Sequence, residues 1–193
     1  MLVGLTGGIG SGKTIVSKVF ETMGCFVYNS DERAKALYYN SNIKKNVIEL
    51  LGSECYLNDH EINKEYISKK VFNYPELLQK LNQIIHPAVK EDFINFKNKL
   101  TEKSIIVKET ALLFEAGINK DLDYTILVTA PIDIKIKRVM SRNHISKEEV
   151  EMRMSSQWSD EQKKNLANIV ITNDESLALI PQVISIIEKL KNA

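Results

Sequence analysis

Residues 2–14 read LVGLTGGIGSGKT, an apolar run that leads directly into a glycine-dense turn. The apolar run over residues 2–5 predicts a buried strand, and apolar residues at helical spacing beyond residue 14 predict a helix. Between them, residues 7–14 match the pattern G-x-x-x-x-G-K-[ST] of a phosphate-binding loop. Strand, loop and helix therefore occur in the order that this pattern requires.

The residue types of this loop suit the binding of a triphosphate together with Mg²⁺. Glycines such as Gly10 and Gly12 keep the backbone bare and permit positive φ, so that backbone N–H groups can converge on phosphate oxygens. Lys13 supplies a charge for the β- and γ-phosphates, and the Thr14 hydroxyl can bind Mg²⁺. The expected nucleotide-binding positions of the stretch are Gly8, Ile9, Gly10, Ser11, Gly12, Lys13, Thr14 and Ile15.

A glycine turn that merely joins a strand to a helix is the alternative interpretation of this stretch. A lone G-x-G would be compatible with it, but the full eight-position match between a strand and a helix favours nucleoside triphosphate binding. The pattern does not say what is done with the nucleotide.

Composition and charge narrow the class of protein. The chain has 193 residues, of which 44% are hydrophobic and 26% charged, as expected for a soluble globular chain with one sizeable α/β core. A formal charge of +1 gives no electrostatic case for nucleic acid. Cys25 and Cys55 show no metal-binding spacing and are expected to be reduced. With neither a signal peptide nor a membrane span visible, we expect a cytoplasmic enzyme without nucleic-acid or membrane partners.

Five apolar segments predict strands, and a helical pattern separates each from the next. This alternation predicts an α/β fold with one parallel, doubly wound sheet. The predicted strands cover residues 2–5, 25–28, 104–108, 124–128 and 167–172.

The segment between the second and third strands carries little strand signal and is too long for an ordinary crossover. Helices are predicted over residues 32–39, 43–51, 66–72 and 76–100, with a loop over 54–62. Pro87 lies inside the last of these helices and predicts a kink or break near His86. We expect a helical subdomain inserted between strands, which is a natural place for an acceptor site.

Two carboxylates follow predicted strands, at the edge where parallel sheets bind their ligands. Asp31 comes shortly after the second strand, and Glu109 follows the third. Ser30 or Asp31 could also cap the next helix, a role that is compatible with catalysis.

A helix predicted over residues 132–143 carries a basic face. Lys135, Lys137, Arg138 and Arg142 stand against the single acid Asp133. Such a face is commonly only solvated, but next to a phosphate loop it could clamp the transferring phosphate. Beyond it, a capping box at Ser146 predicts a helix over 147–154, a short helix starts at Ser159, and a final one covers 177–190.

Taken together, these segments resemble the dephospho-CoA kinases over nearly the whole chain. Residues 4–14 are close to the form that the loop takes in that family, and Asp31 matches its aspartate after the second strand. Further matching positions are Ile85-His86-Pro87, Leu112-Leu113-Phe114-Glu115, Arg138, Arg142, Gln157 and Asn173. The chain departs from the family at Ala111, Lys135 and Asn168, where proline, glutamine and aspartate are usual.

This resemblance implies a P-loop kinase-like three-layer fold with a five-stranded parallel sheet. It implies one kinase domain over residues 1–193, with a helical acceptor-binding subdomain at 32–103 and a small helical lid at 139–160. The implied reaction is ATP-dependent phosphorylation of the ribose 3′-hydroxyl of dephospho-coenzyme A, which gives coenzyme A and ADP in the last step of coenzyme A biosynthesis. We expect a monomer.

The resemblance and the motifs together assign roles to single residues. The catalytic candidates are Lys13, Asp31, Arg138 and Arg142, with Asp31 orienting or deprotonating the attacking hydroxyl. The acceptor-binding candidates are Asp31, His86, Glu109 and Leu113. Glu109 could also act through water on Mg²⁺, and His86 could equally be a packed or capping residue. Asn173 joins the ATP-binding positions, and Thr14 is the expected Mg²⁺ ligand.

Two other functions share the phosphate loop. One is a kinase of a different acceptor, such as a nucleoside monophosphate, against which only the later motifs argue. The other is a GTP-dependent switch, which usually carries N-K-x-D for guanine. Residues 119–122 and 63–66 begin with that Asn-Lys pair but end in Leu122 and Tyr66.

Overall fold

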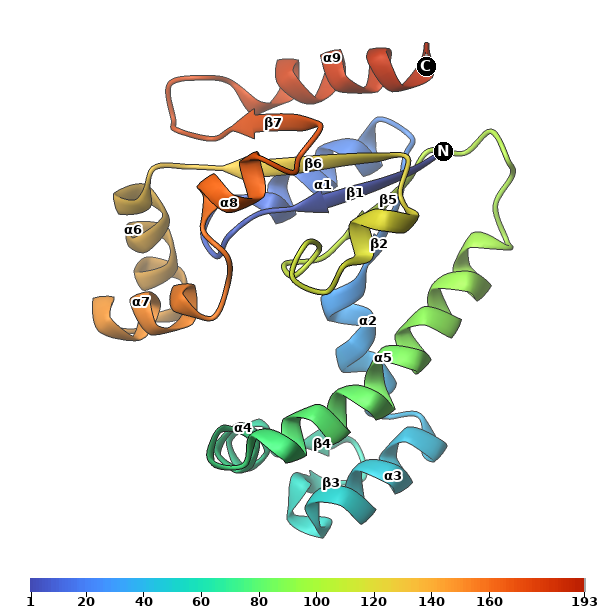
Figure 1. Ribbon diagram of the computed structural model, residues 1–193, viewed down its shortest axis with the longest axis vertical. Helices are drawn as coiled ribbons and strands as arrows, with labels where there is room; N and C mark the ends of the chain where they lie inside the picture. The colour runs from blue at the N-terminus through green and yellow to red at the C-terminus, as the bar shows by residue number, and fades with distance from the viewer. Residues whose placement is uncertain (193) are drawn as a thin grey trace. The chain divides into compact units, whose positions relative to one another are not determined.

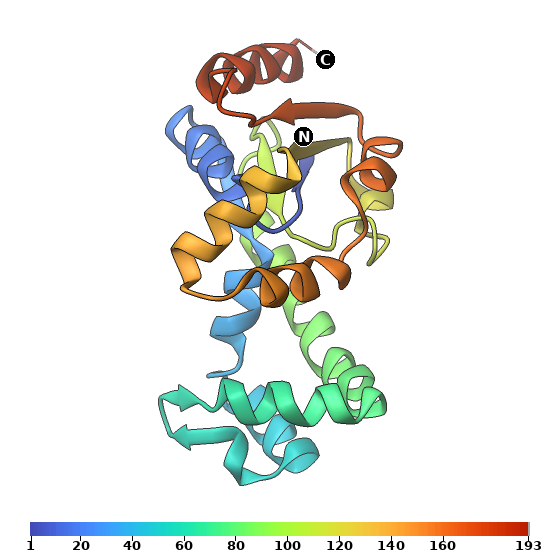
Figure 2. The same cartoon turned by 90° about the vertical axis from the view of Figure 1, so that its left-hand side faces the viewer.

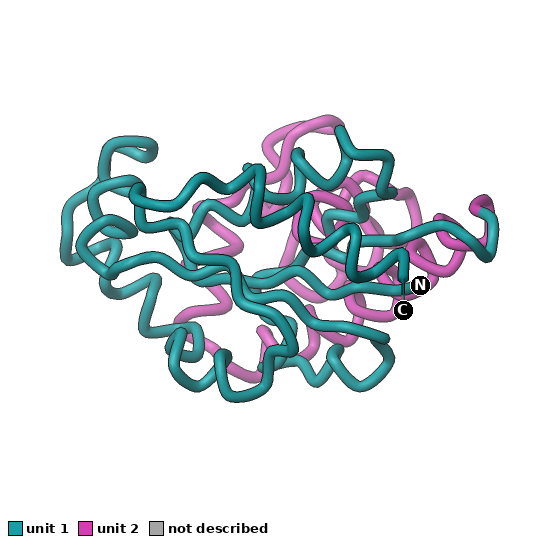
Figure 3. Tube along the Cα trace, turned by 90° about the horizontal axis from the view of Figure 1, so that it is seen from above, with its two compact units in different colours: residues 1–29, 101–193 teal, residues 30–100 magenta. Residues whose placement is uncertain are grey.

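The computed structural model describes residues 1–192 and divides them into two compact units (Figures 1 and 3). Unit 1 comprises Met1–Asn29 and the chain from Thr101 onward, and unit 2 is Ser30–Leu100. The elements of unit 1 are β1 (Leu2–Thr6), α1 (Lys13–Thr22), β2 (Phe26–Asn29), β5 (Ile106–Glu109), η2 (Ile118–Asp121), β6 (Tyr124–Thr129), α6 (Ile132–Asn143), α7 (Lys147–Ser155), α8 (Asp160–Lys164), β7 (Ile169–Thr172) and α9 (Leu179–Lys191).

The sheet of unit 1 has five parallel strands in the order β2-β5-β1-β6-β7. All five strands predicted from the sequence are present, so the predicted parallel sheet is confirmed. β1 lies in the middle, and its register places Leu5 beside Glu109 on one neighbour and Ile126 on the other. The phosphate loop therefore leaves the carboxyl end of the central strand, with the ends of β5 and β6 on either side.

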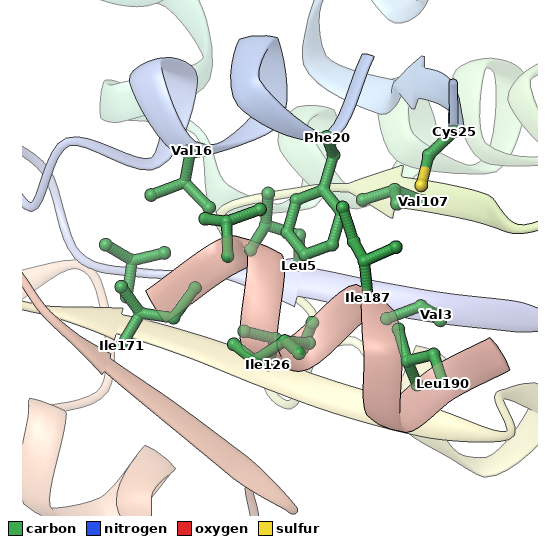
Figure 4. Packing of buried hydrophobic residues seen from close by; sticks show 13 residues of the cluster. Val3, Leu5, Val16, Phe20, Cys25, Val107, Ile126, Ile171, Ile187 and Leu190 are labelled. Carbon is green, nitrogen blue, oxygen red and sulfur yellow. The ribbon is translucent and has the colours of Figure 1, made fainter. Parts of the chain in front are cut away.

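One face of this sheet is covered by α1 and α9, as Figure 4 shows from close by. Alternate strand residues point to this face, as the two-residue period of a strand requires. Val3 and Leu5 of β1 are fully buried against Phe20 of α1 and Ile187 of α9. This packing fixes α1, and with it the helix end from which the loop presents its amides.

The opposite face is covered by the chain that follows β5 and by α8. A Cβ on Gly4 would lie 2.4 Å from side-chain carbons of Leu113 and Leu122, so both leucines pack directly on the central strand. Leu113 is fully buried there, and the stretch around it forms turns before η2. With helices on one face and this segment with α8 on the other, unit 1 has three layers.

The chain between β6 and β7 forms α6, α7 and α8, with α7 packed against α6 (Figures 1 and 2). The capping box predicted at Ser146 is present, with Ser146 and Glu149 bonded to each other's backbone N–H. Ser159 and Gln162 form a second capping box at the start of α8. The short helix expected at Ser159 is therefore confirmed.

Unit 2 contains the helices α2 (Ser30–Leu37), α3 (Ser41–Leu51), α4 (Lys64–Asn73) and α5 (Pro75–Lys97). Its core gathers residues of α3, α4 and α5, among them Val47, Ile67 and Leu81, and an ion pair between Arg33 and Asp92 joins α2 to α5. The expected subdomain at 32–103 overlaps this unit closely, while its role in acceptor binding stays a prediction.

The prediction of a loop over residues 54–62 was wrong. The structure has a 3₁₀ turn, η1 (Ser53–Cys55), and an antiparallel hairpin of β3 (Tyr56–Asn58) and β4 (Glu61–Ile62). Cys55 and Ile62 are buried in the core of unit 2, which explains why so polar a stretch is ordered. The strands are too short for their period to be visible in the sequence.

Pro87 lies inside α5, which continues through it to Lys97. The helix is not broken there, and Figure 1 shows it bending near its middle, as a missing N–H donor and a bulky ring lead one to expect.

The first helix of unit 2, α2, begins at Ser30 itself. Ser30 and Asp31 therefore lie in the first turn rather than at the N-cap, and Ser30 Oγ has no hydrogen-bond partner among the described residues.

Neither cysteine is in a disulfide: Cys25 and Cys55 are free and buried, and burial raises the pKa of both thiols. Within residues 1–192, no helix is both long and apolar enough to cross a membrane.

Candidate active site

The phosphate loop runs from the end of β1 to the start of α1 and is shaped by close contacts on its outer side. Gly10 and Gly12 have φ of +82° and +92°. A Cβ on Gly10 would lie 2.5 Å from the carbonyl oxygen of Lys135, and one on Gly12 would lie 2.1 Å from Asn173 Nδ2. Both conformation and space therefore require glycine at these two positions.

Lys13 extends from the loop to the end of β5. Its Nζ lies 2.9 Å from Oε1 of Glu109, and Asn29 Nδ2 donates to Oε2 of the same carboxylate over 3.3 Å. Glu109 is only 1% exposed. A buried carboxylate needs such partners, because desolvation without them costs several kcal/mol. The strand end predicted to carry a functional acid thus holds it against the lysine of the loop.

The first turn of α1 provides the remaining polar groups of the loop. Gly12 is its N-cap and offers no side chain to the first N–H groups of the helix. Such helix ends bind anions, because N–H groups and the positive end of the helix dipole converge there. Thr14 and Ile15 are exposed in this turn, so the Thr14 hydroxyl is accessible to a phosphate-bound Mg²⁺. No cluster of three or more metal-binding side chains occurs within residues 1–192.

Arg138 and Asn173 brace the loop from the carboxyl side of the sheet. Asn173 is buried, and its Nδ2 donates to the carbonyl oxygen of Ser11 over 2.7 Å. Arg138 Nη2 donates to the backbone and side-chain oxygens of Asn173 at 3.2 and 3.3 Å, and to Glu175 at 3.2 Å. Arg142, one turn further along α6, is exposed and donates to Asn143.

Lys135 and Gln157 contact the first half of the loop. Gln157 Oε1 accepts a hydrogen bond of 3.1 Å from the backbone N–H of Ile9. Lys135, which is buried, forms an ion pair of 2.9 Å with Asp160. A hollow of about 640 Å³ lies beside these residues, lined by Gly8, Ile9 and Trp158 among others, whereas Gly10 to Thr14 are not part of its wall.

The other three predicted acceptor residues are divided between the two units. Asp31 is exposed in the first turn of α2, and His86 is exposed on α5, where it lines a shallow hollow with Asn82 and Pro87; both belong to unit 2. Leu113 is fully buried over Gly4 in unit 1. A part for Leu113 in acceptor binding stays a prediction, and its burial means that it could act only through the shape of its segment.

The sequence assigned no role to Glu115, Asp160 or Lys163, which form ion pairs around the site. Lys163 is fully buried and pairs with Glu115, whose Oε1 also accepts from the backbone N–H of Trp158. In the sequence, Lys163 stands among charged and polar neighbours and looks like a solvated helix residue. Glu115 alone carries a visible signal: it is the first charge after an apolar run and the last residue of the segment Leu112-Leu113-Phe114-Glu115 that matches the family.

Comparisons with known proteins identify the family and the fold of the chain. The profile of the family described as Dephospho-CoA kinase matches residues 1–178. A dephospho-CoA kinase of Bacteroides fragilis is 37% identical over 186 residues, which cover 96% of this chain and 90% of the relative. The crystal structure of TT1252 from Thermus thermophilus has a TM-score of 0.89 at 29% identity and covers 98% of this chain and 97% of its own. Dephospho-CoA kinase from Campylobacter jejuni, at 24% identity, shares the fold with a TM-score of 0.72, covering 99% of this chain and 97% of its own.

The parallel sheet, the phosphate loop on its central strand and the lysine beside a strand-end carboxylate define a kinase of the P-loop class. Within that class, the chain belongs to the dephospho-CoA kinase family. The resemblance found in the sequence is therefore confirmed. This family match favours dephospho-coenzyme A over the two rival functions, a nucleoside monophosphate kinase and a GTP-dependent switch.

The requirement for glycine at position 10 can be tested against a matched substitution. Gly10→Ala should abolish measurable ATP binding, because the new methyl meets the backbone of Lys135 and must displace either the loop or α6. Gly24 has a similar positive φ, but a Cβ there would meet nothing within 4 Å. Gly24→Ala should therefore lower the free energy of unfolding only by the backbone strain, about 1–2 kcal/mol, and should bind ATP normally. Calorimetric titration with ATP and Mg²⁺ would compare the two; equal affinities would refute the packing argument.

Proposed function

We propose that this chain transfers the γ-phosphoryl group of ATP to the ribose 3′-hydroxyl of dephospho-coenzyme A. The observation that carries the proposal is the phosphate loop with Lys13 held at 2.9 Å from Glu109, in a chain of the dephospho-CoA kinase family. Phosphoryl transfer requires mostly positioning and charge neutralisation, and the loop supplies amides, a lysine and a helix end for both.

ATP would lie with its β- and γ-phosphates on the loop, against the N–H groups around Gly10 to Ile15 and the ammonium of Lys13. Arrival of the polyphosphate would draw Lys13 toward the new negative charge, leaving Glu109 to turn toward water or the acceptor hydroxyl. The Thr14 hydroxyl would hold Mg²⁺, which would neutralise part of the negative charge of the phosphates. Asn173 and Arg138 would keep the loop in this shape through their bonds to Ser11 and to each other.

The acceptor side of the reaction falls to residues outside the loop. Asp31 is proposed as the base that orients or deprotonates the hydroxyl, and His86 as a contact to the acceptor. Residues 32–103 are proposed as the acceptor-binding subdomain and 139–160 as a lid. When the lid closes, Arg138 and Arg142 would neutralise charge on the transferring group while water is excluded. We further propose a cytoplasmic monomer.

An acceptor panel tests the function directly. With ATP and Mg²⁺, turnover should be fastest with dephospho-coenzyme A and should give ADP and coenzyme A as the paired products. AMP is the matched control, because it offers a similar adenosine without the pantetheine arm. ADP formed from AMP at a comparable kcat/KM, or nucleotide hydrolysis that no acceptor accelerates, would overturn the proposal.

Removal of the loop lysine should separate chemistry from folding. Lys13→Met should lower kcat by about 10²–10³-fold, the usual loss for one charge-stabilising donor. It should also lower the free energy of unfolding, because Glu109 is left buried without its ammonium. The double variant Lys13→Met/Glu109→Gln should regain stability in urea denaturation but remain inactive. Lys18→Met, an exposed lysine on the same helix, is the control; near-normal kcat in folded Lys13→Met would remove the central assignment.

The proposed base can be tested with an amide of the same shape. Asp31→Asn should lower kcat by about 10²–10⁴-fold while the Kd for ATP stays close to that of the unchanged enzyme, because the amide cannot accept the proton. Glu32→Gln removes the same charge from the same helical turn and should leave kcat unchanged. Unaltered turnover in Asp31→Asn would leave Asp31 with a local role in α2, and a collapse of ATP affinity would point to the metal instead.

A further inference from the structure

Lys163 is a fully buried lysine on a helix of only five residues, α8. Its Nζ lies 2.9 Å from Glu115 Oε1 and donates to the carbonyl oxygen of Ala111 over 3.0 Å. An apolar residue would fill the same space without the desolvation of a charge, so a buried ion pair is a poor device for stability alone. Its geometry, however, ties α8 to the segment that follows β5.

The carboxylate of Glu115 has a second donor. Its Oε1 also accepts from the backbone N–H of Trp158 over 3.0 Å. Burial acts to raise the pKa of Glu115, but the hydrogen bonds from Lys163, from its own backbone N–H and from that of Trp158 outweigh it, and the pKa lies below the ordinary value. Glu115 is therefore ionised at neutral pH and holds both donors at once.

Residues 157–163, which we name the strap, carry this attachment to the phosphate loop. At the start of the strap, Gln157 Oε1 accepts from the backbone N–H of Ile9 over 3.1 Å. In its middle, Asp160 accepts from Thr129 Oγ1 and from Lys135 Nζ. At its end, Lys163 is fixed on Glu115. The strap thus joins the loop, the end of β6, the start of α6 and the segment after β5.

We propose that the Glu115–Lys163 pair is a positioning element for phosphoryl transfer, an inference that rests on the proposed function. The pair fixes the backbone of Trp158, the neighbour of Gln157, and so holds the Gln157 amide against Ile9. Ile9 directly precedes Gly10, where an added Cβ would lie 2.5 Å from the carbonyl oxygen of Lys135. Because a misplacement of about 1 Å can cost about 10²-fold in rate, a loosened strap lowers kcat without removing any group that touches ATP.

A double-mutant cycle tests this connection. Glu115→Gln keeps the shape of the side chain but removes its charge, and Gln157→Ala removes the acceptor for Ile9. Each should lower kcat with dephospho-coenzyme A by about tenfold and change the KM for ATP less than about threefold. The kcat of the double variant should be no lower than that of the more impaired single variant, because both changes act on Ile9 through one connection. Losses that multiply, or a folded Glu115→Gln enzyme with normal kcat, would overturn the proposal.

A second readout does not depend on turnover. Trp158 is the only tryptophan of the chain, and Glu115→Gln should increase the quenching of its fluorescence by acrylamide as the strap loosens. Lys164→Met, on the exposed neighbour of Lys163, is the control and should change neither quenching nor kcat. If Glu115→Gln does not fold by circular dichroism, Glu115→Gln/Lys163→Met, which removes both charges together, replaces it in both experiments. If Glu115→Gln leaves the quenching of Trp158 as it was, the role of the strap is refuted. If the enzyme without substitutions fails to phosphorylate dephospho-coenzyme A, the proposed function is refuted instead.

Discussion

The ion pair between Lys13 and Glu109 joins the phosphate loop to the end of β5, and the geometry of the site depends on it. Glu109 is the last residue of its strand and is almost completely buried. In that position the carboxylate holds the ammonium of Lys13 at 2.9 Å, and we propose that a γ-phosphate replaces it as partner. The register of β5 beside β1 places Glu109 next to Leu5, one residue before β1 ends, so the sheet itself sets this contact.

The other supports of the loop come from the neighbouring strand ends. Asn173 follows β7 and bonds to Ser11, while Lys135 on α6, just beyond β6, packs against Gly10. Gln157 reaches Ile9 from the chain between α7 and α8. Each side chain lies at the carboxyl edge of the same parallel sheet, although they are far apart in the sequence. A loop built mostly of glycine thus takes its shape from the residues around it.

The sequence was sufficient for the sheet, the loop and the identity of the family, and insufficient for the contacts that support them. Periodicity and turn residues are local signals, so the five strands and the capping box at Ser146 could be predicted. The hairpin after Cys55 could not, because its strands are only three and two residues long. Lys163 and Glu115 are 48 positions apart in the sequence, and no local pattern distinguishes a buried lysine from a solvated one. The loop motif named Lys13, and the end of the predicted strand named Glu109, but neither signal paired the two residues.

The position of the transferred phosphate tests the central claim most directly. The chain would be incubated with ATP, Mg²⁺ and dephospho-coenzyme A, and the product examined by phosphorus NMR and mass spectrometry. The account predicts a single new phosphomonoester on the 3′-oxygen of the ribose, formed in equal amount to ADP. Phosphate on the 2′-oxygen, or inorganic phosphate released in place of a phosphorylated acceptor, would contradict it.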